Sequence, residues 1–293
     1  MPTHGYDEPE VGRLLPPQHG AVTESSTAIA AHLAPLGVAV ASLGVTSLLG
    51  ATAWKPTLGH RWPLTVVQES PLYSYPFSVS DTVPYGALMV FAAVFSAAWC
   101  LGFEWWAAAA HAHRRDVWLV AWCGCWESYA WTTTITQLGK LWIQEPRPDF
   151  RDRCWPDLQP PFPADCQANV SSSVIEDGLK SFPSGHASTA GSLGVYLSAY
   201  AMWCAYKRRG GAQHQLMSAM SNGCTQLFQR ATFVLFLMPF IGGAFVGASR
   251  VHDWRHHPWD VTTGFGLGSV VAACMLSRVI SDLEMLDRTP EPK

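Results

Sequence analysis

The chain has 293 residues, and its composition excludes a water-soluble globular protein. Only 14% of the residues are charged, against about 25% in soluble domains, whereas 48% are hydrophobic and 14 are tryptophan. The net charge of −3 provides no basic surface for nucleic acid, and the long apolar stretches exclude a disordered chain. The composition therefore indicates a helical membrane protein.

Six apolar segments are each close to the ~20 residues that a helix needs to cross a bilayer. They predict spans at 28–54, 83–107, 117–139, 186–206, 231–249 and 259–279. Glu127 lies in the middle of the third segment, where a carboxylate is expected to be protonated or paired inside the bundle. The predicted fold is all-α, a polytopic bundle of six transmembrane helices.

The domain organisation follows from these spans. A polar N-terminal tail (1–27), which lacks the apolar core of a cleavable signal peptide, precedes a six-span domain (28–280) and a C-terminal tail (281–293). An even number of crossings places both termini on one side. Positive charge is divided almost evenly between the two sides, but the basic clusters at 114–115 and 207–209 lie in the short links that best report topology. This favours cytosolic termini.

Three polar segments lie at the ends of these spans. Lys140, Arg147 and Pro148 follow the third span with the spacing K-x6-R-P, and P-S-G-H at 183–186 opens the fourth. The pattern S-R-x5-H-x3-D, at 249–260, connects the fifth span to the sixth. Odd-numbered spans end, and even-numbered spans begin, on the membrane face opposite the termini. The topology therefore predicts that all three segments meet on the non-cytosolic face.

The charges in these segments are suited to a phosphate group. Lys140, Arg147 and Arg250 are three cations at one membrane surface, and the arginine fork matches phosphate oxygens. Ser184 and Gly185 stand where a helix begins, so free backbone N–H groups would also face an anion. No cluster of carboxylates is available for Mg²⁺, so no metal or other cofactor is expected.

Two histidines and a carboxylate would supply reactivity. His256 and Asp260 are four residues apart, so on one helix face Asp260 could accept a hydrogen bond from the imidazole and leave its other nitrogen nucleophilic. His186 could protonate the leaving group. His257 is expected to be a neighbour of the nucleophile and not a catalyst.

All three patterns, in this order, resemble the signature of the type 2 phosphatidic acid phosphatase superfamily. The residues around these motifs are similar to the eukaryotic lipid phosphate phosphatases, including diacylglycerol pyrophosphate phosphatases. The similar segments are R-P-D-F-R-D-R-C from Arg147 and R-V-H-D-W-R-H-H from Arg250. The resemblance covers about 83–280 and implies a Mg²⁺-independent helical bundle with a phosphohistidine intermediate. It implies that His256 is the nucleophile, Asp260 its orienting carboxylate and His186 the acid. It assigns phosphate binding to Lys140, Arg147, Ser184, Gly185 and Arg250.

The link between the third and fourth spans carries two further expectations. Cys154 and Cys166 are its only cysteines, and Asn169 begins an N-glycosylation triplet. The crossing count places this link in the secretory lumen or outside the cell, where disulfides persist. We therefore expect a Cys154–Cys166 disulfide and a glycosylation candidate at Asn169.

The expected function is hydrolysis of membrane lipid phosphates, namely phosphatidate, diacylglycerol pyrophosphate and lysophosphatidate, in an endomembrane or the plasma membrane. The bilayer is the expected partner, nucleic acid is not, and the sequence does not set the oligomeric state. Polyprenyl-diphosphate and sphingoid-phosphate phosphatases of the same superfamily remain alternatives. Vanadate-dependent haloperoxidases share the motifs but are soluble. A transporter or scramblase would spread its charges through the membrane depth, whereas here they gather at one face.

Overall fold

The computed structural model describes residues 20–52, 56–78, 80–108, 117–208 and 222–288, and no strand occurs in this part of the chain. Its long helices are α1 (Gly20–Thr52), α3 (Tyr85–Ala108), α4 (Val117–Ile143), α7 (Gly185–Trp203), α9 (Asn222–His252) and α10 (Pro258–Arg288). Its short elements are α2 (Leu64–Glu69), η1 (Pro71–Tyr73), α5 (Phe150–Cys154), α6 (Ser172–Gly178) and the π-helical turn η2 (Cys204–Arg208).

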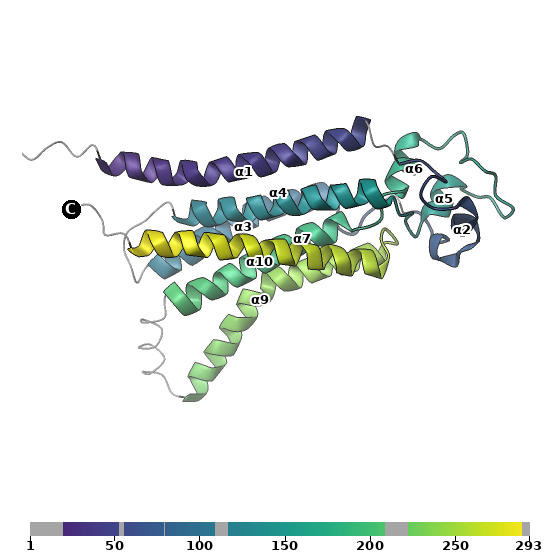
Figure 1. Ribbon diagram of the computed structural model, residues 1–293. Helices are drawn as coiled ribbons and strands as arrows, with labels where there is room; N and C mark the ends of the chain where they lie inside the picture. Colours follow the sequence, from purple (N-terminus) through teal and green to yellow (C-terminus); the bar gives the residue numbers. More distant parts are fainter. Residues whose placement is uncertain (1–19, 53–55, 79, 109–116, 209–221, 289–293) are drawn as a thin grey trace, which may run out of the picture.

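The long helices form a bundle in which α7 contacts α4, α9 and α10, while α1 packs on α4 (Figure 1). The short helices α2, α5 and α6 lie together at one end of the bundle, opposite the end where α1 begins and α10 finishes (Figure 1). Helix α9 contains Pro239 and leans away from the other helices toward its N-terminal end. A proline removes one backbone hydrogen bond and permits such a bend.

The central helices α7 and α10 approach closely because glycine lines their crossing. A Cβ atom on Gly191 would lie 2.5 Å from the carbonyl oxygen of Phe265, and one on Gly268 would lie 2.1 Å from that of Ser188. No side chain fits at either position. Small residues allow membrane helices to pack backbone against backbone in this way.

By length and composition, four helices of the described chain could cross a membrane: Leu33–Thr52 of α1, Tyr85–Trp106 of α3, Arg230–His252 of α9 and Pro258–Met285 of α10. The prediction of six spans is therefore met for four. Helices α4 and α7 are less apolar because neighbouring helices bury much of their surface, which permits serine, threonine and Glu127.

The carboxylate inside the bundle is paired, as predicted. The Arg278 guanidinium of α10 donates to both carboxylate oxygens of Glu127, with Nη1 3.1 Å from Oε1. Because an isolated charge inside a membrane bundle is costly, this pair explains how α4 retains a carboxylate near its middle.

Helical structure extends into both segments expected as tails, since α1 begins at Gly20 and α10 runs to Arg288. The remaining tail residues, 1–19 and 289–293, lie outside the described residues, as do the basic pair at 114–115 and residue 209.

A second, smaller core holds the loops together at the end of the bundle that carries α2, α5 and α6. Its buried residues are Val67, Tyr73, Phe150, Cys154, Trp155 and Leu179. The expected disulfide joins Cys154 to Cys166 within this core. The triplet at Asn169 lies on the exposed surface of the same loops.

Candidate active site

The three motif segments meet where α4 ends, α7 begins and α9 passes into α10. Two backbone hydrogen bonds join them: Ser181 donates to the carbonyl of Glu145 over 2.9 Å, and Ser184 donates to the carbonyl of Asp260 over 3.1 Å. Main-chain contacts thus hold together residues that are 36 and 76 positions apart in the sequence, and such contacts position side chains with little freedom.

His256 is 3% exposed and faces the carboxylate of Asp260. Its Nδ1 atom lies 3.6 Å from Asp260 Oδ2 and 3.5 Å from the Ser181 hydroxyl. The predicted pair is therefore present, but the reason for it was wrong. Helix α10 begins only at Pro258, so His256 precedes the helix and does not share a helical face with Asp260.

Asp260 is instead oriented by its place in the first turn of α10. Its Oδ2 atom accepts the backbone N–H of His257 over 2.9 Å, which is the way a third-position side chain caps a helix N-terminus. The Ser181 hydroxyl donates to the same oxygen over 2.5 Å. The Nδ1 atom of His257 lies 3.3 Å away. The His257 N–H, the Ser181 hydroxyl and the His257 ring therefore hold the carboxylate in place, and the ring of His256 faces the same oxygen.

The electrostatic surroundings favour a neutral His256. Burial lowers the pKa of His256 well below its ordinary value, and the charges of Arg147 and Lys140 lower it further, while Asp260 acts in the opposite direction. A neutral imidazole whose Nδ1 faces a carboxylate keeps Nε2 available as a nucleophile.

Lys140 and the N-terminus of α7 lie side by side. The Nζ atom of Lys140 donates to the carbonyl of Lys180, and a Cβ atom on Gly185 would lie 3.7 Å from Lys140 Cε. Ser184 caps α7 by accepting the N–H of Ala187. The first N–H groups of the helix and the ammonium group therefore share one location, as an anion site requires.

The two arginines are each held by carboxylates. Arg147 donates to Asp177 Oδ1 over 2.8 Å, and Arg250, 1% exposed, donates to Asp253 Oδ2 over 2.9 Å. The Nη1 atom of Arg250 is buried without a hydrogen bond, 3.4 Å from Asp81 Oδ1. A buried N–H group without a hydrogen bond is costly, so this group is suited to a ligand oxygen.

His186 lies in the first turn of α7, and its ring makes an edge contact with Tyr85 at 5.0 Å between centroids. Its Nε2 atom is buried and has no hydrogen-bond partner. A phosphate bound beside this ring would favour its protonated form, because an opposite charge stabilises an imidazolium.

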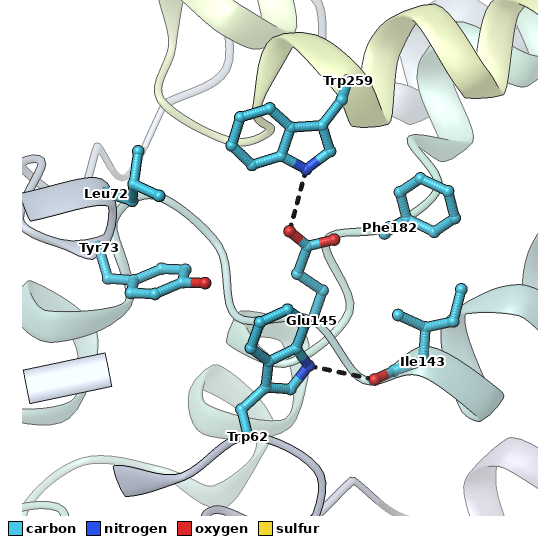
Figure 2. Close-up of a pocket in the computed structure, with 7 residues that line it drawn as sticks. All are labelled: Trp62, Leu72, Tyr73, Ile143, Glu145, Phe182 and Trp259. Carbon is cyan, nitrogen blue, oxygen red and sulfur yellow. Dashed lines mark hydrogen bonds between the residues drawn. The ribbon is translucent and has the colours of Figure 1, made fainter. Parts of the chain in front are cut away.

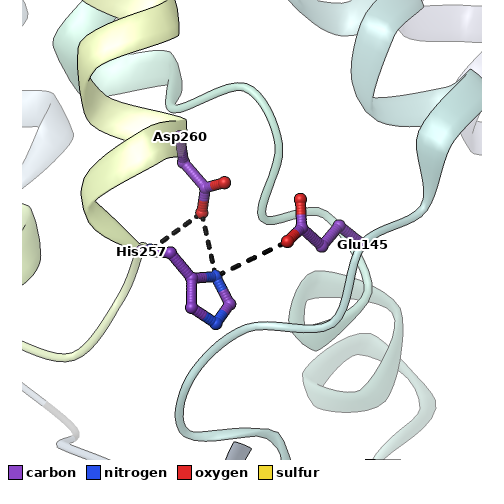
Figure 3. Close-up of side chains that lie close together, drawn as sticks. All are labelled: Glu145, His257 and Asp260. Atoms are coloured by element: carbon purple, nitrogen blue, oxygen red, sulfur yellow. Dashed lines mark hydrogen bonds and ion pairs between the residues drawn. The ribbon is translucent and has the colours of Figure 1, made fainter. Parts of the chain in front are cut away.

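One group of side chains in the described chain has the composition of a metal site. Glu145, His257 and Asp260 each place a ligand atom within 4.8 Å of the others (Figure 3). However, Asp260 Oδ2 already accepts from His257 and Ser181, and Glu145 Oε1 accepts the indole N–H of Trp259 over 3.0 Å. We interpret the cluster as a hydrogen-bonded network that supports Asp260.

Comparison with known proteins identifies the family. Residues 121–281, more than half of the chain, match the PAP2 superfamily. The chain belongs to the PAP2 superfamily. All three motif segments lie inside the matched region, and no solved structure matches the chain.

Relatives of this PAP2 protein are named as lipid phosphate phosphatases or diacylglycerol pyrophosphate phosphatases. It is 31% identical to Lipid phosphate phosphatase 1 of Arabidopsis thaliana over 48% of this chain and 39% of that protein. It is 26% identical to Probable diacylglycerol pyrophosphate phosphatase 1 of Schizosaccharomyces pombe over 72% of this chain and 70% of the relative. It is 32% identical to Diacylglycerol pyrophosphate phosphatase 1 of Saccharomyces cerevisiae over 54% of this chain and 51% of that protein. In two of these three, the match spans about half of the relative or less.

Sequence reasoning missed several residues of this PAP2 site. The Ser181 hydroxyl donates to Asp260, and Glu145 Oε1 lies 3.8 Å from His257 Nδ1; each of the two stands two residues before a motif residue, which was the available signal. Asp81 pairs with Arg255 over 2.8 Å, and Thr82 donates its hydroxyl to Asp253 over 2.5 Å. The loop before α3 therefore holds the third motif in place through these contacts, although no sequence pattern within the loop predicts them.

Proposed function

We propose that the protein is an integral membrane phosphatase that hydrolyses phosphatidate, diacylglycerol pyrophosphate and related lipid phosphates. The observation that carries the proposal is the assembly, at one end of the bundle, of a histidine–carboxylate pair, a second histidine and three cations. These residue types supply a nucleophile, an acid and an oxyanion-stabilising cradle, the components of phosphoryl transfer.

The proposed reaction has two steps. His256 Nε2 attacks phosphorus, the bond from phosphorus to the leaving oxygen breaks, and the proton of His186 passes to that oxygen. Water then attacks the phosphohistidine, gives a proton to His186, and releases phosphate and neutral His256. Lys140, Arg147 and Arg250 stabilise the equatorial oxygens throughout, which is the role that Mg²⁺ has in other phosphatases.

We further propose that α4 and α7 cross the membrane with the four apolar helices, which gives six spans. They are surrounded by α1, α3, α9 and α10, and proteins tolerate polar residues in spans that face the bundle interior. With cytosolic termini, the site opens to the lumen of an endomembrane compartment or to the cell exterior.

The cradle surrounds the phosphate, so head-group discrimination should be loose and lysophosphatidate should also be a substrate. The names of the yeast and plant relatives support lipid phosphates as the substrate class. Sphingoid phosphates and polyprenyl diphosphates remain the alternative substrates. A transporter is disfavoured because the described motif segments, which carry these charges, all lie at one end of the bundle (Figure 1).

The experiment is phosphate release from phosphatidate by purified protein with a chelator present. We expect activity that vanadate inhibits, and a loss of at least ~10³-fold in His256→Gln. His252→Gln is the control, since its side chain is 83% exposed. Acid quenching should trap phosphate on wild-type protein but not on His256→Gln. A strict Mg²⁺ requirement, or more than a few per cent activity in the variant, would contradict the mechanism.

His186→Ala separates the acid from the nucleophile. Protonation matters less for a good leaving group, so activity should fall more on phosphatidate than on an activated aryl phosphate. Equal losses on both substrates would contradict the assignment of His186.

A further inference from the structure

A pocket of about 470 Å³ lies next to the histidine–carboxylate pair, since its lining residue Glu145 places a carboxylate oxygen within 4.8 Å of Asp260 (Figure 2). Trp62, Tyr73, Phe182 and Trp259 form most of its wall, and Glu145 is its one carboxylate. These residues come from four separate segments of the chain. No step of the proposed reaction uses this pocket.

The two indole rings are fixed in place. Trp62 donates its N–H to the carbonyl of Ile143 over 3.3 Å, and Trp259 donates to Glu145 Oε1 over 3.0 Å (Figure 2). One face of Trp259 stacks on His257 with ring centroids 4.4 Å apart. The aromatic wall is therefore preorganised, and a ligand would bind without ordering these side chains.

The pocket has one acidic lining residue, Glu145. Among the lining residues, which all belong to the described chain, none is cationic. Burial raises the pKa of Glu145 to about 7, and the charge of Asp260 adds to this effect. The other titratable groups on this side are His257 and the phenol of Tyr73, whose pKa burial raises to about 12. A bound cation would stabilise the ionised form of Glu145.

Aromatic faces around a carboxylate select a particular kind of cation. A metal ion prefers several oxygen or nitrogen ligands, which the aromatic wall does not offer. An acyl chain gains nothing from a carboxylate. An organic ammonium group satisfies both features, because its alkyl surface packs on the rings, the ring faces attract its charge, and the carboxylate pairs with it.

We propose that this pocket binds an organic ammonium group, the choline or ethanolamine head group of a phospholipid next to the active site. The lining residues Ile143, which ends α4, and Trp259, in the first turn of α10, place the pocket at the level of the proposed membrane surface. Leu72 and Trp259 are 44% and 43% exposed at its edge, so a head group can enter. The proposal is independent of the phosphatase activity.

The test is calorimetric titration of the full chain, in a maltoside detergent that contains no ammonium group, with choline and with its neutral isostere 3,3-dimethylbutan-1-ol. We expect choline to bind about tenfold more tightly than the isostere. Glu145→Gln keeps an oxygen acceptor for Trp259 but should remove this preference. Glu69→Gln, an exposed carboxylate of α2, is the matched control and should retain it.

Equal affinity for choline and its isostere in wild-type protein, or an unchanged preference in Glu145→Gln, would overturn the proposal. Nanodiscs identify the source of the ammonium group. Choline should bind more weakly in phosphatidylcholine nanodiscs than in phosphatidylglycerol nanodiscs, because the head group competes. Equal binding in both would overturn the head-group assignment. If choline binding is reduced only by a non-hydrolysable long-chain amino-alcohol phosphonate, and not by phosphatidylcholine, the ammonium group in the pocket belongs to a substrate.

Discussion

At the scale of single residues, the oxygen Oδ2 of Asp260 is the most heavily shared acceptor of the site. The Ser181 hydroxyl, the His257 N–H and both imidazole rings face it at distances from 2.5 to 3.6 Å. Each added donor stabilises the negative charge and fixes its direction. The orientation of His256 therefore depends on residues that no attacking or leaving atom touches.

Ser181→Ala tests this dependence. A hydrogen bond to a charged group contributes about 1.5–3 kcal/mol, so we expect kcat to fall by about 10- to 100-fold with little change in KM. The exposed Ser173→Ala in α6 serves as the control. A KM effect without a kcat effect would place Ser181 in substrate binding and not in positioning.

Glu145 gives a pH-dependent stability. An unfolded glutamate ionises near pH 4.5, whereas burial moves the folded pKa to about 7. Between these values the folded state binds more protons, so the free energy of unfolding decreases as pH rises through this window. Glu145→Gln lacks this loss, and its Tm relative to wild type should be higher at pH 8 than at pH 5. The same Tm difference at both pH values would show that Glu145 is ionised throughout.

The residue-scale features differ in how far sequence could predict them. Lys140 and Arg250 were found because each has fixed spacing within a motif. Asp81 and Asp177 have no such spacing, and their partners lie far away in the chain, so only the folded loops bring them to Arg250 and Arg147. Local pattern therefore identifies candidate reactive residues more readily than the residues that hold them in place.

At the scale of elements, the long helices were predictable because their uncharged stretches are long. The N-terminal part of α9 was not, since Arg230 interrupts the apolar pattern while the helix itself begins at Asn222. The short helices α5 and α6 were missed for a different reason. With five and seven residues, they depend on the small core around Phe150 and not on their own propensity.

The disulfide is expected to stabilise the short helices α2, α5 and α6 and the small core between them. Closing a loop of 12 residues should contribute about 3 kcal/mol in the chain-entropy description. We expect the Cys154→Ala, Cys166→Ala double variant to have a lower Tm and to be cleaved faster by protease at 155–165. Cys274→Ser, an exposed free cysteine on α10, is the control. Unchanged stability would show that the small core suffices without the bridge.

At the scale of the whole molecule, the end of the bundle that carries the site is opposite the end where α1 begins and α10 finishes (Figure 1). If the termini are cytosolic, the substrate must be in the non-cytosolic leaflet. We expect sealed vesicles with the C-terminus outside to leave lipid phosphate in the outer leaflet intact until detergent is added. Immediate hydrolysis would show that the orientation is inverted.

The position of Asp260 in α10 has a consequence for biosynthesis. Asp260 lies in the first turn of α10 and follows every other motif residue in the chain. Every earlier part of the site, from Lys140 to His256, is synthesised before the carboxylate that orients the nucleophile is in place. Under the proposed mechanism, a nascent chain is inactive toward lipid phosphates until α10 has been synthesised and has packed on α7.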